Sequence, residues 1–247
     1  MQPNSVLGPH VPTVRRTGEV AQLEPDGEGA DDAAGQPRPG VSRGRRWLAH
    51  RNVWGVLCGL FCVRLGGYFF IVLFPSYLLE ERHVGPDWTL ACVTAAPELA
   101  AVAGVWAGRR CSDRLLRAGV GLTTARKIPL VGGLMCGAPG ALAAVAPNSW
   151  VAVALLTAHY GGLSFAAASA AALAADLAPS PRHAADLAGM NGLVANVAML
   201  SSPLLFVILK GITTSFVPSL MLTSTLAVFG AISYGVLVGR VGPLPPR

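Results

Sequence analysis

The chain has 247 residues, of which 52% are hydrophobic and only 13% are charged, and its mean hydropathy is +0.51. Soluble domains carry about 25% charged residues, so this composition excludes an ordinary soluble protein and predicts an integral membrane protein. The net charge of +6 does not indicate a nucleic-acid partner, because the basic residues lie beside apolar segments, where attraction to anionic lipid accounts for them.

Residues 1–47 differ in composition from the rest of the chain. They are rich in Gly, Pro, Asp, Glu and Arg, and they contain no apolar run long enough for the core of a signal peptide. We therefore expect a disordered cytoplasmic leader. The first apolar helix would then act as its own uncleaved membrane-targeting signal.

Six long apolar stretches follow the leader, and each reaches the roughly 17 to 20 residues that a helix needs to cross a bilayer. Their small residues allow helices to approach closely inside a membrane, so we expect helices and not barrel strands. The predicted fold is all-α, with a six-helix bundle over residues 48–241 and a cytoplasmic tail over residues 242–247. The expected spans are 53–79, 88–108, 128–146, 150–177, 187–209 and 217–239.

Lys and Arg are shared unevenly between the loops. They are concentrated before the first span and in residues 109–127, whereas the alternate loops carry few of them. The positive-inside rule then places both termini in the cytoplasm. The richness in Ala, Gly and Arg is compatible with a high-GC bacterium, so the expected location of this multi-pass protein is a bacterial inner membrane.

Two ionisable residues interrupt apolar spans near their middle. Arg64 lies eleven residues after Val53, about 16 Å, and Glu98 lies ten residues after Trp88, about 15 Å, in a hydrocarbon core about 30 Å thick. Charges at this depth are costly and usually functional. Two interpretations are open: a direct ion pair between neighbouring helices, or a substrate carboxylate on Arg64 with a coupling proton on Glu98.

The run GRRCSDRLLR at 108–117 stands between the second and third spans and resembles the G-x-x-x-D-R-x-x-R loop of the major facilitator superfamily. Further runs resemble, in order and spacing, the second half of that superfamily's anion:cation symporter family. They are RNVWG at 51–55, ARK at 125–127 and DLAP at 176–179. The resemblance covers about residues 47–241.

This resemblance implies a carboxyl-terminal half of a twelve-helix transporter, in which substrate binds between two halves that rock to alternate access. It implies small organic anions such as sugar acids as substrates, protons as coupling ions, and a second six-helix half or a homodimer partner. Asp113, Arg114 and Arg117 would form a cytoplasmic gating loop that latches the halves. The alternatives are a membrane scaffold that does not transport and an inactive truncated remnant.

Three further residues are candidates for the site. Tyr68 lies one helical turn beyond Arg64, so it can orient a substrate hydroxyl or simply pack. His159, nine residues into the fourth span, can carry a proton or bond a neighbouring helix. Asn196 matches the family pattern and can bind a sugar or another helix.

An enzyme is not expected. Gly162-Leu163-Ser164 with His159 faintly suggests a serine protease, but Phe165 stands where a Gly is needed and the other histidine, His183, falls in a loop. The sequence contains no phosphate-binding loop and no metal or haem motif, and its five cysteines lack the spacing of a zinc site or a disulfide framework. No cofactor is expected.

Overall fold

The computed structural model describes residues 50–177 and 180–239, without the side chains of residues 181–183. All described residues belong to one compact unit. The predicted leader, residues 1–47, and the predicted tail, residues 242–247, lie outside the described residues.

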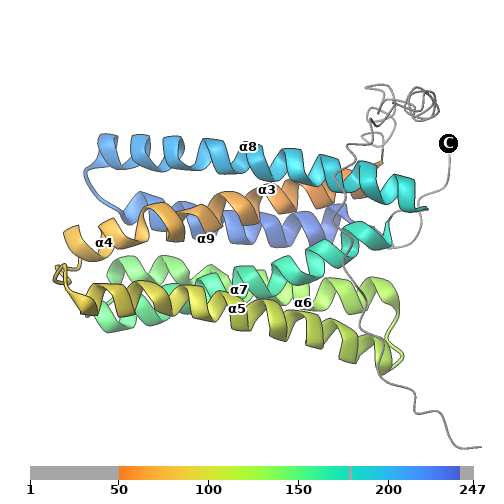
Figure 1. Ribbon diagram of the computed structural model, residues 1–247, viewed down its shortest axis with the longest axis horizontal. Helices are drawn as coiled ribbons and strands as arrows, with labels where there is room; N and C mark the ends of the chain where they lie inside the picture. Colours follow the sequence, from red (N-terminus) through yellow and green to blue (C-terminus); the bar gives the residue numbers. More distant parts are fainter. Residues whose placement is uncertain (1–49, 178–179, 240–247) are drawn as a thin grey trace, which may run out of the picture. The chain divides into compact units, whose positions relative to one another are not determined.

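Within the described residues, six helices are long and apolar enough to cross a membrane and no strand occurs, so the predicted all-α bundle is confirmed (Figure 1). The elements are α3 (Arg51–Val72), α4 (Phe74–Glu80), α5 (Trp88–Arg117), α6 (Leu122–Gly137), η1 (Ala138–Val145), α7 (Ser149–Asp176), α8 (Pro181–Thr213), α9 (Val217–Ile232) and η2 (Ser233–Leu237).

The first predicted span is interrupted. A turn at Leu73 separates α3 from α4, and Pro75 stands in the first turn of α4. Proline has no backbone N–H to donate to the carbonyl four residues earlier, which explains the break here. The third predicted span likewise changes from α6 to the 3₁₀-helix η1, whose first turn contains Pro139.

The predicted loop over residues 109–127 was wrong in extent, because α5 continues to Arg117 and α6 begins at Leu122. The helix is ended by Gly119, whose φ of +80° lies in the left-handed region. The N–H of Gly119 bonds the carbonyl of Leu116, and that of Val120 bonds the carbonyl of Leu115, both at 3.1 Å. This is a Schellman motif, which needs glycine at this position. Arginine favours the helix up to that point.

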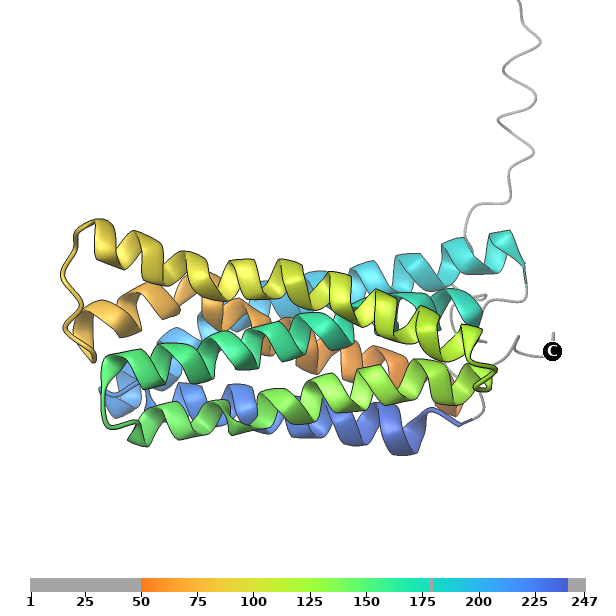
Figure 2. The same ribbon diagram turned by 90° about the horizontal axis from the view of Figure 1, so that it is seen from below.

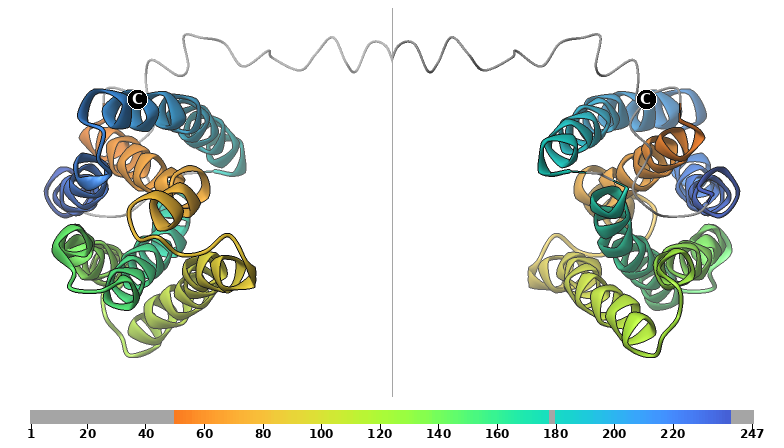
Figure 3. Two further views of the ribbon diagram at one scale, coloured as in Figure 1. Left: turned by 90° about the vertical axis from the view of Figure 1, so that its left-hand side faces the viewer. Right: turned by 90° about the vertical axis from the view of Figure 1, so that its right-hand side faces the viewer.

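The bundle consists of two groups of three long helices. α3, α8 and α9 contact one another in the first group, and α5, α6 and α7 contact one another in the second. Contacts of α3 with α7 and of α6 with α9 join the groups. Figure 2 shows the second group from its own side, and Figure 3 shows both groups end on.

Close approach of backbones holds the second group together. A Cβ on Gly104 would clash with the carbonyl of Gly161, and one on Gly108 with the carbonyl of Phe165. On the other side of α7, a Cβ on Gly133 would meet the Gly162 carbonyl at 2.8 Å. Such small-residue contacts are how helices associate in lipid, where burial of apolar surface gives little driving force.

The two ends of the bundle differ in charge. At the end where α3 begins, Arg51 donates to the carbonyl of Val236 at 2.7 Å, and Lys127 donates to the carbonyl of Gly235 at 3.1 Å. These carbonyls belong to the last helical turn, η2, where helices leave acceptors unsatisfied. The basic residues at this end are Arg51, Arg109, Arg110, Arg114, Arg117, Arg126 and Lys127.

The opposite end carries mixed charges. Lys210 pairs with Glu80 at 2.5 Å, which joins α8 to α4. Arg82 donates to the Tyr77 hydroxyl at 2.6 Å and to the carbonyl of Ala146 at 3.3 Å, which joins the turn after α4 to the end of η1. The charge difference between the ends is the one that the positive-inside rule uses.

Candidate functional site

Arg64, on α3, lines two neighbouring cavities of about 100 and 190 Å³. Both cavities also share Ala167 of α7. The side chain of Arg64 is exposed in the described bundle. Its charge therefore lies at an open face near the middle of a membrane-spanning helix, between two small hollows.

Hydroxyl groups line the smaller cavity. Tyr68 of α3 faces it, as predicted, together with Tyr160 and Ser164 of α7. The Tyr160 ring stacks on Phe70 with centroids 4.4 Å apart and an interplanar angle of 14°. This stacking fixes the ring, so the phenol is presented to the cavity in one orientation.

The direct ion pair between Arg64 and Glu98, one of the two interpretations left open by the sequence, is not formed among the described residues. The ion pairs formed among residues 50–177 and 180–239 are Arg126 with Asp176 and Lys210 with Glu80. The expectation failed because α3 and α5 are consecutive spans but not packed neighbours: α7 contacts both of them. Tyr160 of α7 lies within electrostatic range of both charges, and Glu98 itself is exposed.

Two residues that the sequence did not single out line the larger cavity beside Arg64. Asn191 contributes from α8, and Tyr234 contributes from η2. The Tyr234 hydroxyl is fully buried and has no hydrogen-bond partner within the described part of the chain. A buried hydroxyl is costly to leave unpaired, so this group is available to a bound molecule or a water. Tyr234 could not be assigned to the site of Arg64 from the sequence, because the two residues lie on different elements, and only the structure shows that α3 and η2 are in contact.

His159 lies outside both cavities. Its ring is buried, stacks on Phe70 at 5.7 Å, and bonds the carbonyl of Gly137 through Nδ1. A carbonyl only accepts, so Nδ1 carries the proton and Nε2 holds the lone pair. Nε2 is buried with no partner among the described residues. The ring therefore joins α7 to the junction of α6 and η1.

Asn196 does not line the cavities beside Arg64, and its side chain is exposed on α8. It lies five residues after Asn191, about 140° further round the helix. The two asparagines therefore point in different directions. The larger cavity is lined by Asn191 and not by Asn196, the residue that matched the family pattern.

Asp113, Arg114 and Arg117 lie in the last turns of α5 and not in a loop, and all three are exposed. Arg117 donates to the carbonyl of Asp113 at 3.4 Å, near the negative end of the helix. The polar contacts that join the helices at this end of the bundle are made by Ser112, from the same run of sequence, and by Arg126 and Asp176.

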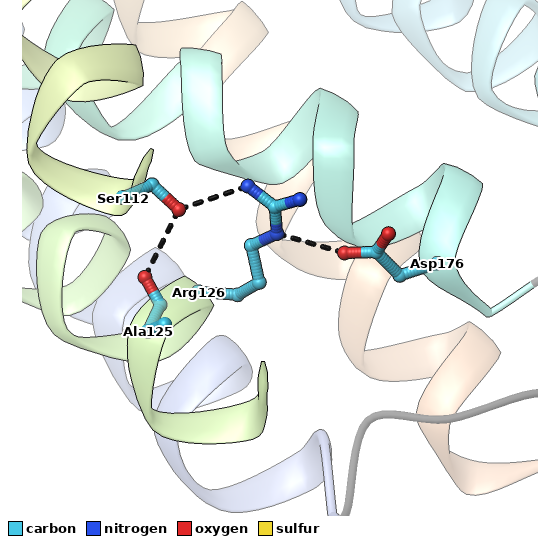
Figure 4. A network of polar contacts seen from close by, with 4 residues as sticks. All are labelled: Ser112, Ala125, Arg126 and Asp176. Carbon is cyan, nitrogen blue, oxygen red and sulfur yellow. Dashed lines mark hydrogen bonds and ion pairs between the residues drawn. The ribbon is translucent and has the colours of Figure 1, made fainter. Parts of the chain in front are cut away.

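Ser112, Arg126 and Asp176 form a network between α5, α6 and α7 (Figure 4). Arg126 donates from Nε to Asp176 at 2.7 Å and from Nη1 to the Ser112 hydroxyl at 2.9 Å. Ser112 in turn donates to the carbonyl of Ala125 at 3.1 Å. Residues of three family-like runs of the sequence, GRRCSDRLLR, ARK and DLAP, thus meet in space.

The model of the Major Facilitator Superfamily matches residues 15–203. This chain belongs to the major facilitator superfamily. With six apolar helices of spanning length, it is a multi-pass membrane protein. Within the part of this major facilitator chain that the structure describes, no group of three His, Cys, Asp or Glu side chains is placed to hold a metal ion.

The major facilitator chain is similar to several bacterial proteins named as sugar-acid transporters. It is 30% identical to a D-galactonate transporter of Escherichia coli O6:H1 over 83% of this chain and 46% of that protein. It is 28% identical to a probable galactarate/D-glucarate transporter of Bacillus subtilis over 80% and 43%. With a probable galactarate/D-glucarate transporter of Escherichia coli K12 it shares 27% identity over 92% and 50%.

The chain thus spans about half the length of the curated relatives that it matches. The expected resemblance to the carboxyl-terminal half of a sugar-acid transporter of this superfamily is confirmed.

Proposed function

We propose that this chain supplies one six-helix half of a secondary transporter for small polyhydroxylated carboxylates, coupled to protons. The observation that carries the proposal is the exposed charge of Arg64 beside two cavities. A charge near mid-membrane is tolerated where it faces water or protein but not where it faces lipid. The face around Arg64 therefore belongs to a solvated cavity, which is where a transporter binds its substrate.

The chemistry of this face fits a sugar acid. The guanidinium of Arg64 can hold a carboxylate by two parallel hydrogen bonds. The hydroxyls of Tyr68 and Tyr160 and the amide of Asn191 lie on either side of it and can bind the hydroxyls of the carbon chain. The names of the relatives, which are transporters of galactarate, D-glucarate and D-galactonate, support the same substrate class.

A second six-helix half is part of the proposal. The cavities of about 100 and 190 Å³ are each below the roughly 300 Å³ at which small-molecule sites begin. The membrane spans within α5 and α8 are also only 17% buried, against 39% to 50% for the other four. A second copy, or a separate six-helix chain, would cover these helices and close the site.

Glu98 is the proposed proton carrier. Its carboxylate and the guanidinium of Arg64 both act on the Tyr160 hydroxyl, so an ionised Glu98 offsets part of the positive potential that attracts an anion. Protonation of Glu98 removes that opposition and strengthens substrate binding. Proton and anion would therefore bind together, as a symporter requires.

The remaining predicted residues take supporting roles in this proposal. His159 is not the coupling group in this proposal, because its ring is buried outside both cavities beside Arg64 and joins α7 to the junction of α6 and η1. Asn196, and the exposed group Asp113, Arg114 and Arg117, face outward and would meet the second half. The basic end of the bundle, and with it both termini, would face the cytoplasm of a bacterial cell.

The test is binding of radiolabelled D-galactonate and D-glucarate to the purified full chain in detergent, in mildly acid and mildly alkaline buffer. We expect binding that strengthens in acid, that Arg64→Gln weakens about 10- to 100-fold, and that loses its pH dependence in Glu98→Gln. The matched control is Lys210→Gln, because Lys210 is a cation at the far end of the bundle.

Reconstituted vesicles with an inward proton gradient then test transport. Uptake should occur only in preparations whose mass in light scattering corresponds to at least two copies of the chain. No binding of either sugar acid by a monodisperse preparation of at least two copies would contradict the proposed substrate class. Uptake by single copies would contradict the need for a second half.

A further inference from the structure

The two cavities beside Arg64 extend in opposite directions along α3. The lining of the larger cavity includes Val56 and Leu60, which lie between Arg64 and the end of the bundle where α3 begins. The lining of the smaller cavity includes Tyr68 and Ile71, which lie beyond Arg64 toward the opposite end. An anion whose carboxylate is bound by Arg64 can therefore extend its carbon chain into either cavity, and the two cavities offer that chain different groups.

One hydroxyl in the larger cavity has no partner within the described part of the chain. Tyr234 is fully buried and lines the cavity, yet its hydroxyl forms no hydrogen bond with any described residue. Buried polar groups in folded proteins are almost always paired, because an unpaired one loses its hydration without compensation. The partner of this hydroxyl must therefore be a molecule that enters the cavity.

The ring of Tyr234 is held in a fixed position against α3. A Cβ on Gly59 would clash with the ring, so the ring fits here only because residue 59 is a glycine. The neighbouring Ser233 donates to the carbonyl of Gly55 at 3.0 Å, which joins η2 to the same helix. η2 is a π-helical turn, a rare conformation that is frequent at functional sites. These contacts orient the phenol and leave its hydroxyl unused.

The chemistry of the larger cavity fits a hydroxylated carbon chain. Asn191 of α8 offers a donor and an acceptor, and the Tyr234 hydroxyl can do either. Apart from Arg64, the other described residues that line the cavity are alanine, glycine, valine and leucine, which can contact the C–H groups of the chain. A chain without hydroxyls would fill the same space but would leave the phenol unpaired.

We propose that the larger cavity is a subsite that selects for hydroxyl groups, in which Tyr234 binds a hydroxyl of the anion whose carboxylate is held by Arg64. This inference rests on the proposed transport function and adds the residue that distinguishes a sugar acid from an unsubstituted carboxylate of equal length. A site built to bind a substrate hydroxyl discriminates against an analogue that lacks it, because the polar group of the site is then left unpaired. Tyr234 is therefore a specificity-determining residue.

The experiment compares binding of D-galactonate and of hexanoate, which has the same number of carbons and one carboxylate but no hydroxyls. Both are titrated into monodisperse preparations of at least two copies of the parent chain and of Tyr234→Phe. The parent chain should favour D-galactonate, and Tyr234→Phe should lower that preference about five- to tenfold, with hexanoate binding unchanged or tighter. The thermal midpoint of the variant without ligand should equal or exceed that of the parent chain, because an unpaired buried hydroxyl has been removed.

Tyr77→Phe is the matched control. It also removes a buried tyrosine hydroxyl, but the Tyr77 hydroxyl accepts from Arg82 at 2.6 Å and Tyr77 lines neither cavity beside Arg64. The control should have a lower thermal midpoint and should keep the parent chain's preference for D-galactonate. An equal loss of preference in the control would overturn the subsite.

The remaining outcomes separate this inference from the proposed function. Binding of D-galactonate that depends on Arg64 but is unchanged in Tyr234→Phe would leave the proposed function standing and overturn the subsite alone; water would then be the partner of the Tyr234 hydroxyl. No binding of D-galactonate by the parent chain would contradict the proposed function and this inference together.

Discussion

Two arginines within the helices of this bundle show opposite environments. Arg126 is 14% exposed and is held by Asp176 and Ser112, so its charge is neutralised and three helices depend on it. Arg64 is exposed, forms none of the ion pairs found in residues 50–177 and 180–239, and lines two cavities. The same side chain is structural in one place and available in the other.

The difference separates stability from binding. A charge whose hydrogen bonds are all made within the chain stabilises the fold and has little left to offer a ligand. A charge left open at a cavity costs stability, and such groups concentrate where function requires them. Variants of the two arginines should therefore affect different measurements.

The largest effect is expected from breaking the structural arginine. Arg126→Gln or Asp176→Asn leaves its partner's charge partly buried without a counter-charge, which should cost about 2 kcal/mol or more of stability. Thermal unfolding followed by fluorescence-detected size exclusion should show a clear fall in the midpoint. An unchanged midpoint in both variants would remove the distinction between the two arginines.

Arg64→Gln should have the converse effect. Folding and thermal midpoint should stay near those of the parent chain, whereas binding of D-galactonate should fall about 10- to 100-fold, because a charge-assisted hydrogen bond to an anion is lost. Arg64→Lys keeps the charge but lacks the planar guanidinium that binds a carboxylate by two parallel hydrogen bonds. Its affinity should therefore lie between those of the parent chain and Arg64→Gln. Loss of folded protein in Arg64→Lys would show that Arg64 is structural after all.

The fold was largely predictable from the sequence because apolar runs of bilayer length admit few structures. Ends of helices were less predictable. The arginines at 109–117 indicate a cytoplasmic side but do not show whether the helix continues, and here Gly119 decides where it stops. The breaks near Leu73 and Ala138 are explained by Pro75 and Pro139, although a proline within an apolar run does not by itself show whether a membrane helix bends or stops.

The site was predictable only where one helix carries it. Tyr68 was placed correctly on the face of Arg64, because helical spacing within α3 decides that. Tyr160 and Tyr234 could not be found, since their place depends on how α7 and η2 pack against α3. The expected contact of Arg64 with Glu98 failed for the same reason: consecutive helices need not be neighbours.

A smaller effect is expected at Tyr160, which lines the smaller cavity beside the open arginine, Arg64. Tyr160→Phe keeps the stacking on Phe70 but removes the hydroxyl, so stability should hold while sugar-acid affinity falls about five- to tenfold. Tyr160→Leu, which removes the stacked ring as well, should lower the thermal midpoint. Unchanged affinity in Tyr160→Phe would limit the binding site to Arg64 and its larger cavity.

The smallest effect is expected at an exposed charge, Asp87, which caps α5 at the rim of a hollow that Arg82 and Ser149 also line, and which forms none of the ion pairs found in residues 50–177 and 180–239. Its carboxylate accepts from the N–H of Thr89 at 2.9 Å, and this bond holds the pKa of Asp87 below its ordinary value. A lowered pKa in the folded state means that the cap stabilises the helix at pH values above the pKa of the unfolded chain, and that this stabilisation is lost as the pH falls through the pKa of the folded chain.

Backbone hydrogen exchange in the first turn of α5 should therefore be faster in Asp87→Ala than in the parent chain at neutral pH. The two should converge in strong acid, whereas Asp87→Asn, whose amide oxygen still caps, should stay protected throughout. If Asp87→Ala and the parent chain already agree at neutral pH, the cap contributes nothing, and only charges engaged between helices, as Arg126 is, stabilise this bundle.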